Sequence, residues 1–390
     1  DVENAFGFPT GIAPNDNDNI SPRIALAWDL NADGRSVVRA GAGYFYGRTP
    51  YILGGNVLQT DRPQATVNCG GSILDGDPDA PPPVTPYPGW STSGWDNPRT
   101  CAGGGDQSGV PAYTFWQPDF QYPETFKANL GFAQELFSGT QVSVDLLFSE
   151  STNLYTVRNI NLRDPQFELA GESGRRVFKP EGDFDPTTSG SPVPSYLNTD
   201  FAPVYVNYND GRARTFAATF EVVQPLFQTT TLRGSYTFTS SYDNSSYSCC
   251  TASSGHGDPT VGAFGPNDIG GVGDESRAWG PSDFMRAHTF IIAGSTRLPY
   301  GFSLSGSWRI QSGQPFTPEM QGDVNGDGVN YNDRPFIYAP EDLPLASEGT
   351  AAEAEEREAY RNILADNSCL GDYVGQIVPR GTCRAPRTNQ

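Results

Sequence analysis

The chain has 390 residues, of which 44 are glycine and 33 are proline, and its formal net charge is −20. This composition is typical of many strands joined by long polar loops, and no apolar run approaches the roughly 18 residues of a transmembrane helix, which excludes one. The net charge argues against a phosphate-binding surface, because lysine and arginine total only 25 and form no cluster, and nucleic acid is therefore not an expected partner.

Four segments alternate apolar and polar residues with the period of a β-strand, and each predicts a hairpin. They lie near residues 23–46, 125–150, 212–240 and 286–312. In the second hairpin, one face is almost entirely apolar: Phe126, Ala128, Leu130, Phe132, Val142, Val144, Leu146 and Phe148. The four hairpins together predict an all-β fold with eight long antiparallel strands.

Such an apolar face needs a partner other than water, either a second sheet in a soluble core or the lipid of a membrane. The links within each hairpin are short, and four long polar loops follow them: 47–124, 151–211, 241–285 and 313–390. This alternation is typical of outer-membrane barrels, which have tight periplasmic turns and long outer loops. Four charged residues occupy the opposite face of the strands: Arg39, Asp145, Glu221 and Arg233. Because charge is costly in a dry core, we expect a transmembrane β-barrel whose apolar face contacts outer-membrane lipid.

The last long loop also contains one helix candidate. The stretch "TAAEAEEREAYRNILADN" is rich in alanine and glutamate, which favour a helix, and most of its face is charged. We expect one short, solvated loop helix there.

Six cysteines occur in segments rich in Gly, Ser, Asn or Asp: Cys69, Cys101, Cys249, Cys250, Cys369 and Cys383. Cysteines in such loops indicate disulfides formed outside the cytoplasm. We expect Cys69 to pair with Cys101 and Cys369 with Cys383, since each pair closes a loop on the outer side. A bridge between the neighbours Cys249 and Cys250 is left open, because it strains the peptide between them.

The stretch "DVNGDGVNYND" at residues 323–333 has the beginning of an oxygen-ligand calcium loop. Arg334 stands where an EF-hand carries its last acidic ligand, and Asp333 comes one residue early. Two interpretations stay open. The first is a calcium site formed by Asp323, Asn325, Asp327 and Asp333, and the second is an Asn/Asp/Gly turn without a metal. No other cofactor is expected.

Motifs of catalysis are missing from the sequence, which has no GxSxG, HExxH or Walker pattern. His288 lies at the start of a predicted strand without a nucleophile motif, which favours a structural role. We therefore expect a protein that is not an enzyme.

Several stretches, taken in order, resemble the barrel of Oar-like TonB-dependent transporters. They are "NISPRIALAWDLNADGRSVVRAGAGYFYGRTP", "RTFAATFEVVQPLFQTTTLRGSYTFTSSYD", "RAHTFIIAGSTRLPYGFSLSGSWRIQSGQPFT", "DVNGDGVNYNDRP" and the closing "SCLGDYVGQIVPRGTC". The succession carries the resemblance, since each stretch alone is a weak signal.

The resemblance implies an outer-membrane barrel of about 22 strands with an N-terminal plug, which moves a large or scarce ligand inward with energy passed through TonB. Residues 1–390 show eight long strands and no plug-like domain. We therefore expect a fragment that covers the C-terminal part of such a barrel, with outer-membrane lipid, the TonB complex and an unidentified ligand as partners. The alternative is a secreted, calcium-dependent β-rich binding or adhesion protein.

Overall fold

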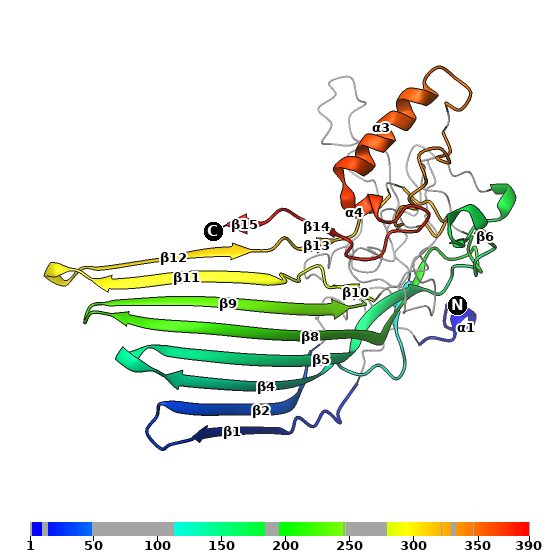
Figure 1. Cartoon of the computed structure of the whole chain (residues 1–390). Coiled ribbons are helices and arrows are strands. Elements are labelled where there is room, and N and C mark those ends of the chain that lie inside the picture. The colour runs from blue at the N-terminus through cyan, green and yellow to red at the C-terminus, as the bar shows by residue number, and fades with distance from the viewer. Residues whose placement is uncertain are drawn as a thin grey trace, which may run out of the picture.

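The computed structural model describes residues 2–9, 15–48, 113–183, 195–244, 246, 279–320, 322–328, 333–345 and 347–389. Eight long strands follow one another across a single sheet in chain order (Figure 1). They are β1 (Arg23–Asp29), β2 (Ser36–Tyr46), β4 (Glu124–Glu135), β5 (Gln141–Asn159), β8 (Val204–Leu226), β9 (Thr230–Asp243), β11 (His288–Arg297) and β12 (Ser303–Gln311). All neighbouring pairs among them are antiparallel, which confirms the fold expected from the alternating segments.

Three short strands complete an 11-stranded sheet, and two small sheets lie outside it. The additional strands of the large sheet are β3 (Tyr113–Trp116), β10 (Gly280–Pro281) and β15 (Thr388–Asn389). One small sheet consists of β6 (Phe167–Leu169) and β7 (Arg175–Val177), and the other consists of β13 (Pro315–Phe316) and β14 (Cys383–Arg384). The α-helices of the described residues are α1 (Val2–Phe6), α3 (Glu353–Asp366) and α4 (Ser368–Gly371). The expected loop helix is α3. In the described part of the chain, no helix has the length and apolar character needed to span a membrane.

The structure differs from the sequence prediction at two places. Strands β5 and β8 extend past the predicted hairpin and stay paired as far as Asn159 and Tyr205, through register shifts between Ser151 and Thr156. The extension of β8 alternates only over a few residues, with Val204 and Val206 on one face, and this short pattern lies inside a segment that reads as a polar loop. Strand β3 was expected to be loop; all four of its residues are buried, and a strand buried on both faces shows no alternation either. It pairs with β8 in parallel, which is the exception to the antiparallel pattern among the described strands.

Among the described residues, no second sheet packs against the apolar face of the large sheet. Leu130, Leu146, Phe220 and Phe290 have exposed fractions of 51, 37, 48 and 50%. A sandwich core would bury these side chains, whereas a lipid-facing surface leaves them uncovered by protein.

The large sheet is open. Strand β1 pairs with β2 alone, and β12 pairs with β11 and β15, so the first and last long strands do not pair with each other in the described chain. An open arc of this kind is what the sequence predicts for eight strands of a larger barrel.

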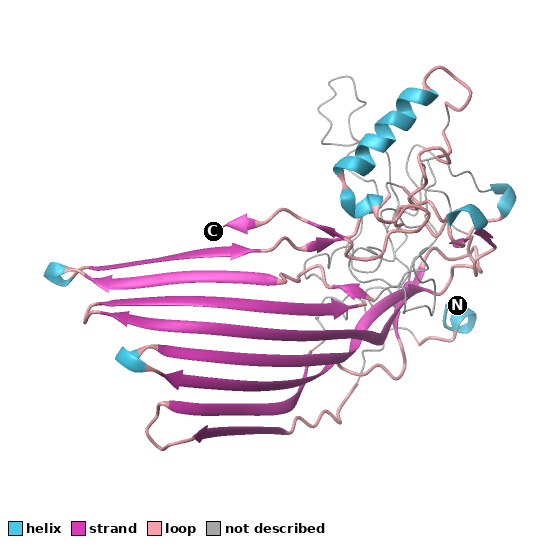
Figure 2. Ribbon diagram, viewed as in Figure 1, coloured by secondary structure: helices cyan, strands magenta, loops and turns pink. Residues whose placement is uncertain are grey.

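The two ends of the sheet differ (Figure 2). The four short links of the hairpins lie together at one end, which we call the turn end. The α-helices and the small sheets lie at the other, the loop end. We call the described residues at the loop end, including the extensions of β5 and β8 beyond the predicted hairpins, the cap.

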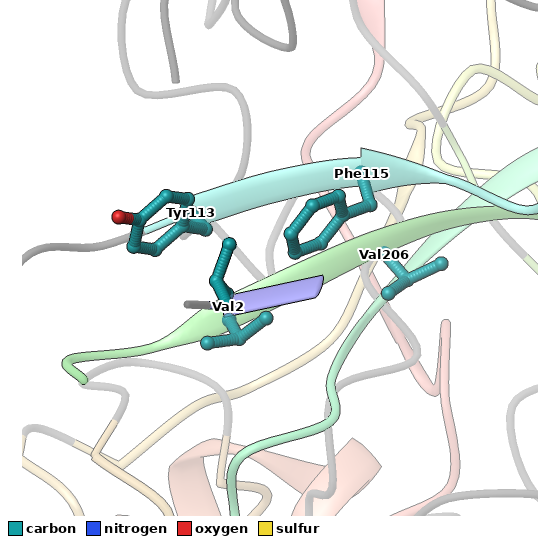
Figure 3. Close-up of a cluster of buried hydrophobic side chains, with 5 residues drawn as sticks. Val2, Tyr113, Phe115 and Val206 are labelled. Atoms are coloured by element: carbon teal, nitrogen blue, oxygen red, sulfur yellow. The ribbon is translucent and has the colours of Figure 1, made fainter. Parts of the chain in front are cut away.

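The buried hydrophobic core lies in the cap, where α1, β3 and the start of β8 meet (Figure 3). Its members are Val2, Tyr113, Phe115, Val204 and Val206. The apolar side chains of the membrane strands thus need lipid, while those of the cap bury one another.

Candidate functional site

The four residues of the predicted calcium loop lie together in the cap. Asp323, Asn325, Asp327 and Asp333 are all buried. Asp323 organises the loop, because its Oδ1 accepts hydrogen bonds from the amides of Gly326 (2.7 Å) and Asp327 (3.0 Å). Its Oδ2 accepts the amide of Gly328 at 2.8 Å. Gly326 and Gly328 have φ angles of 77° and 88°, which glycine adopts without strain.

Asp333 closes this loop from its other side. Its Oδ2 accepts the amides of Val324 (2.7 Å) and Asn325 (3.2 Å), and its Oδ1 lies 3.4 Å from Nη1 of Arg175. The side chain of Asp333 therefore faces a guanidinium as well as the loop.

The chemistry of these residues suits calcium, since carboxylate and amide oxygens are its ligands. Their arrangement is that of a hydrogen-bonded turn: among the residues that the structure describes, no group of three or more His, Cys, Asp or Glu side chains is placed to hold a metal ion. Oδ1 of Asp323 already accepts two backbone amides and Oδ2 accepts one, so only Oδ2 keeps room for one more partner. Burial raises the pKa of the Asp323 carboxyl, and the three loop amides partly offset this. Calcium at this loop stays a prediction.

Arg175 is the charged centre of the cap and was missed in the sequence. Its side chain is 1% exposed, and its Nε lies 2.5 Å from Oε2 of Glu172. Its Nη2 donates to the carbonyl of Arg334 at 2.9 Å. Oε1 of Glu172 accepts the hydroxyl of Tyr338 at 2.5 Å, and burial together with this contact raises the pKa of Tyr338. Arg175 thus joins the β6–β7 hairpin to the loop that carries the predicted calcium ligands.

The C-terminal part of the cap is fastened by a disulfide. Cys369 and Cys383 are bonded with an S–S distance of 2.02 Å, the pairing expected from the sequence. This bond connects α4 to β14. Strand β14 in turn pairs with β13, which follows the last membrane strand, β12, in the chain. Cys69, Cys101, Cys249 and Cys250 lie outside the described residues.

Arg380 ties the same segment to the sheet. Its Nη2 lies 2.6 Å from Oδ1 of Asp243 at the end of β9, and its Nη1 donates to the Asp243 carbonyl at 2.7 Å. Oγ of Ser246 accepts a further hydrogen bond at 2.5 Å, and Asp283 lies 3.8 Å away. The cap is therefore held to the strands by buried charge as well as by the backbone.

The polar face of the sheet carries the charged residues predicted for the lumen. Nε of Arg233 lies 3.5 Å from Oε2 of Glu221, and the hydroxyls of Thr219 and Thr237 are 3.0 Å apart on the same face. On the apolar face near the loop end, Nδ1 of His288 lies 2.9 Å from the Tyr236 hydroxyl, which agrees with a structural role for that histidine.

Comparisons with solved structures find outer-membrane proteins at low sequence identity. The transporter YddB from Escherichia coli is 15% identical with a TM-score of 0.43, over 80% of this chain and 31% of its own. The FrpB iron transporter from Neisseria meningitidis is 8% identical with a TM-score of 0.35, over 76% of this chain and 27% of its own. A mutant of the ferric enterobactin receptor PfeA from Pseudomonas aeruginosa is 12% identical with a TM-score of 0.31, over 81% of this chain and 38% of its own. The chain thus spans about a third of the length of these structures.

No curated protein sequence matches the chain. A family model described as the outer membrane beta barrel domain matches residues 2–390, nearly the whole chain. This match and the uncovered apolar face identify the environment of the strands as the outer membrane of a Gram-negative bacterium, and they exclude the secreted soluble alternative. The chain belongs to the outer membrane beta barrel domain family.

Proposed function

We propose that the chain forms part of an Oar-like, TonB-dependent outer-membrane transporter that takes up a large or scarce ligand. The observation that carries this proposal is the open sheet of eight long membrane strands, whose first and last members do not pair. A closed barrel of eight strands has an interior just wide enough for its own side chains. An arc that is still open after eight strands fits a much wider barrel, and a wide barrel can pass a large solute.

The polar face supports the same proposal. Ion pairs such as Arg233 with Glu221, and rows of threonine and serine hydroxyls, line the side of the sheet that faces away from lipid. This surface suits contact with water, with a plug domain or with a polar ligand. Because the charged residues there come in both signs, they do not favour an anion or a cation by themselves.

The cap is the part of the chain that a ligand from outside would meet first. Buried ion pairs and a disulfide hold it in one arrangement, which is what recognition by loops requires. In this proposal, ligand specificity comes from the cap and the long loops, and TonB acts through a plug.

A calcium ion at the Asp323 loop is part of the proposal. The observation that favours it is the burial of three carboxylates, Asp323, Asp327 and Asp333, within one short loop. Burying several like charges is unfavourable unless cations are near. Calcium there would fasten the loop against the β6–β7 hairpin.

The uptake proposal is tested by depletion of compounds from culture medium. Cells that produce the protein in their outer membrane are compared with cells that lack it, each with and without a functional TonB, and the medium is followed by mass spectrometry. We expect at least one compound to disappear only when both the protein and TonB are present. Depletion that does not depend on TonB would indicate a passive channel and overturn the proposal, as would the absence of any depletion.

A further inference from the structure

Two cationic side chains meet over one aromatic ring on the polar face of the sheet, close to the loop end. The guanidinium carbon of Arg23 lies 4.3 Å from the centroid of the Phe45 ring, and Nζ of Lys127 lies 5.4 Å from the same centroid. The three residues come from β1, β2 and β4, which are neighbours in the large sheet (Figure 1). Because an aromatic ring attracts cations, Phe45 gathers two positive charges at one place on the wall.

Strand register and a glycine bring these side chains together. Arg23 and Lys127 both pair with Gly43, from opposite sides, so the three residues form one row across the sheet. A Cβ atom at Gly43 would lie 2.7 Å from Cγ of Arg23, so the arginine side chain crosses the space above this glycine. Glycine is the residue that leaves such a space open. The Arg23 side chain therefore lies over the sheet, toward Phe45 and Lys127.

In the described part of the chain, neither Arg23 nor Lys127 forms an ion pair. Across β4, β5 and β8, the two rows that contain these cations and the ring continue with uncharged side chains: Thr125, Ser149, Ser151, Ala213 and Thr215. Glu124 is next to Thr125 in the sequence but lies on the other face, where it accepts the Tyr46 hydroxyl at 2.5 Å. The two cations therefore share this part of the described wall without an acidic residue.

The two positive charges also repel each other. Both distances run to the same ring centroid, so the charged ends are closer together than the Debye length of about 10 Å at about 0.1 M salt. A bound anion would remove this repulsion and accept a charge-assisted hydrogen bond from each cation. In a chain with a net charge of −20, this place favours an anion.

Hydroxyl groups extend the same surface toward β9. The hydroxyls of Thr125 and Ser151 are 2.9 Å apart, and those of Thr215 and Ser241 are 2.8 Å apart. In each pair, one hydroxyl donates to the other, which leaves the second hydrogen for a ligand. These neutral donors add hydrogen bonds to an anionic molecule without adding charge.

Two lumenal cations further from the loop end have acids beside them. Arg39 and Asp145 share one row, with Gly131 between them, and Oδ1 of Asp145 lies 2.5 Å from the place of a Cβ atom at that glycine. Arg233 lies beside Glu221. The cation pair at the loop end thus differs in charge from these parts of the wall, and it lies where a solute from outside arrives first.

We propose that Arg23 and Lys127 bind an anionic group, a carboxylate or a phosphate, of the ligand that the transporter takes up. This inference rests on the proposed function and names the chemical class of its ligand. The ligand is favoured over a carboxylate of another protein segment because both cations are exposed and lie at the loop end. Phe45 and the hydroxyl pairs would contact the uncharged part of the ligand.

Nuclear magnetic resonance of the lysines tests this site directly. The full chain, extracted from outer membranes, has two lysines, Lys127 and Lys179. Methylation with ¹³C keeps their positive charge, and the variants Lys127→Arg and Lys179→Arg assign the two signals. The probe is inorganic phosphate in calcium-free buffer, with chloride at equal ionic strength as the reference. We expect phosphate to shift the Lys127 signal to saturation, while Lys179 in the cap does not respond.

Two substitutions that remove the same charge distinguish local binding from general electrostatics. Arg23→Gln should weaken phosphate binding at Lys127 about tenfold or more, the loss expected for one charge-assisted hydrogen bond. Arg309→Gln, on the same face of the sheet in β12, should leave this binding unchanged. Equal effects of the two substitutions, an equal response to chloride, or a Lys127 signal that ignores phosphate would each overturn the proposal.

The failure of this inference and the failure of the proposed function give different results. Phosphate binding at Lys127 needs no transport, so binding without any depletion of the medium would overturn the uptake proposal and leave the anion site. TonB-dependent depletion of an uncharged compound, or of an anionic compound whose uptake Arg23→Gln leaves unchanged, would overturn the anionic ligand class while the uptake function stands.

Discussion

The membrane strands and the cap keep the same chain folded by opposite means. The strands bury few of their own apolar side chains and rely on regular hydrogen bonding to their neighbours, with lipid covering the outside. The cap buries an arginine, several carboxylates and a small aromatic core, and it adds a disulfide. Apolar and polar residues alternate along the strands because lipid lies on one side of the sheet and water on the other. The cap has no such signal, because its contacts join distant segments.

The comparison is tested most strongly at Arg175. Arg175→Met should destabilise the cap by about 3 to 5 kcal/mol, because Glu172 and Asp333 would stay buried without their cation. Hydrogen exchange of the protein in lipid should show lost protection in residues 167–178 and 333–345, with the membrane strands unchanged. The control is Arg361→Met on the exposed side of α3, where we expect a change below about 0.5 kcal/mol. Equal effects of the two substitutions would contradict the buried network.

The membrane half of the comparison is tested at Leu146. Leu146→Arg should cost about 2 to 4 kcal/mol, because a charge near the middle of the bilayer has no water to meet. Ser143→Arg, on the polar face of the same strand, should cost far less. Denaturant unfolding in phospholipid vesicles measures both free energies. Similar costs at the two positions would argue against a lipid-facing side of β5.

Calcium sharpens the comparison, because it should act on the cap alone. If the Asp323 loop binds calcium with a dissociation constant of about 1 mM, adding about 10 mM should stabilise the cap by about 1.4 kcal/mol. Hydrogen exchange of residues 322–328 with calcium and with a chelator measures this effect. Asp327→Asn should abolish it. An unchanged loop in wild type would favour the turn without a metal.

The smallest expected effect is a pH dependence at Asp283. Burial raises the pKa of its carboxyl, and the nearby Arg380 partly opposes this. Since the folded pKa lies above the unfolded value, the folded cap binds this proton more tightly. Its stability should therefore rise as the pH falls from neutral through the folded pKa.

Asp283→Asn should remove that contribution. The measurement is hydrogen exchange of residues 279–287 over a pH series, corrected for the intrinsic exchange rates. The raised pKa of Asp283 would be contradicted if the hydrogen-exchange protection of this segment fell from pH 7 to acidic pH equally in the wild type and in the variant.

Short-range patterns were enough to predict the membrane strands. The alternation from Phe126 to Phe148 predicts two strands and the face that meets lipid, and both are found. The pairing of Cys369 with Cys383 follows from two cysteines that close one loop. The calcium-loop spacing brings Asp323, Asn325 and Asp327 together because a turn rich in glycine is a local structure.

Other features could not be predicted because they depend on contacts between remote segments. Strand β3 is four buried residues with no period, and its parallel partner on β8 lies about 90 residues further along the chain. Arg175 is one of two adjacent arginines, and its burial depends on remote partners such as Asp333, 158 residues away.

The sequence by itself determined the strands, their lipid-facing side and the short turns, because side-chain period and turn chemistry act over a few residues. Tertiary structure alone decided where the cap buries its charges, since the energy of a buried arginine depends on which carboxylates the fold brings within a few ångströms.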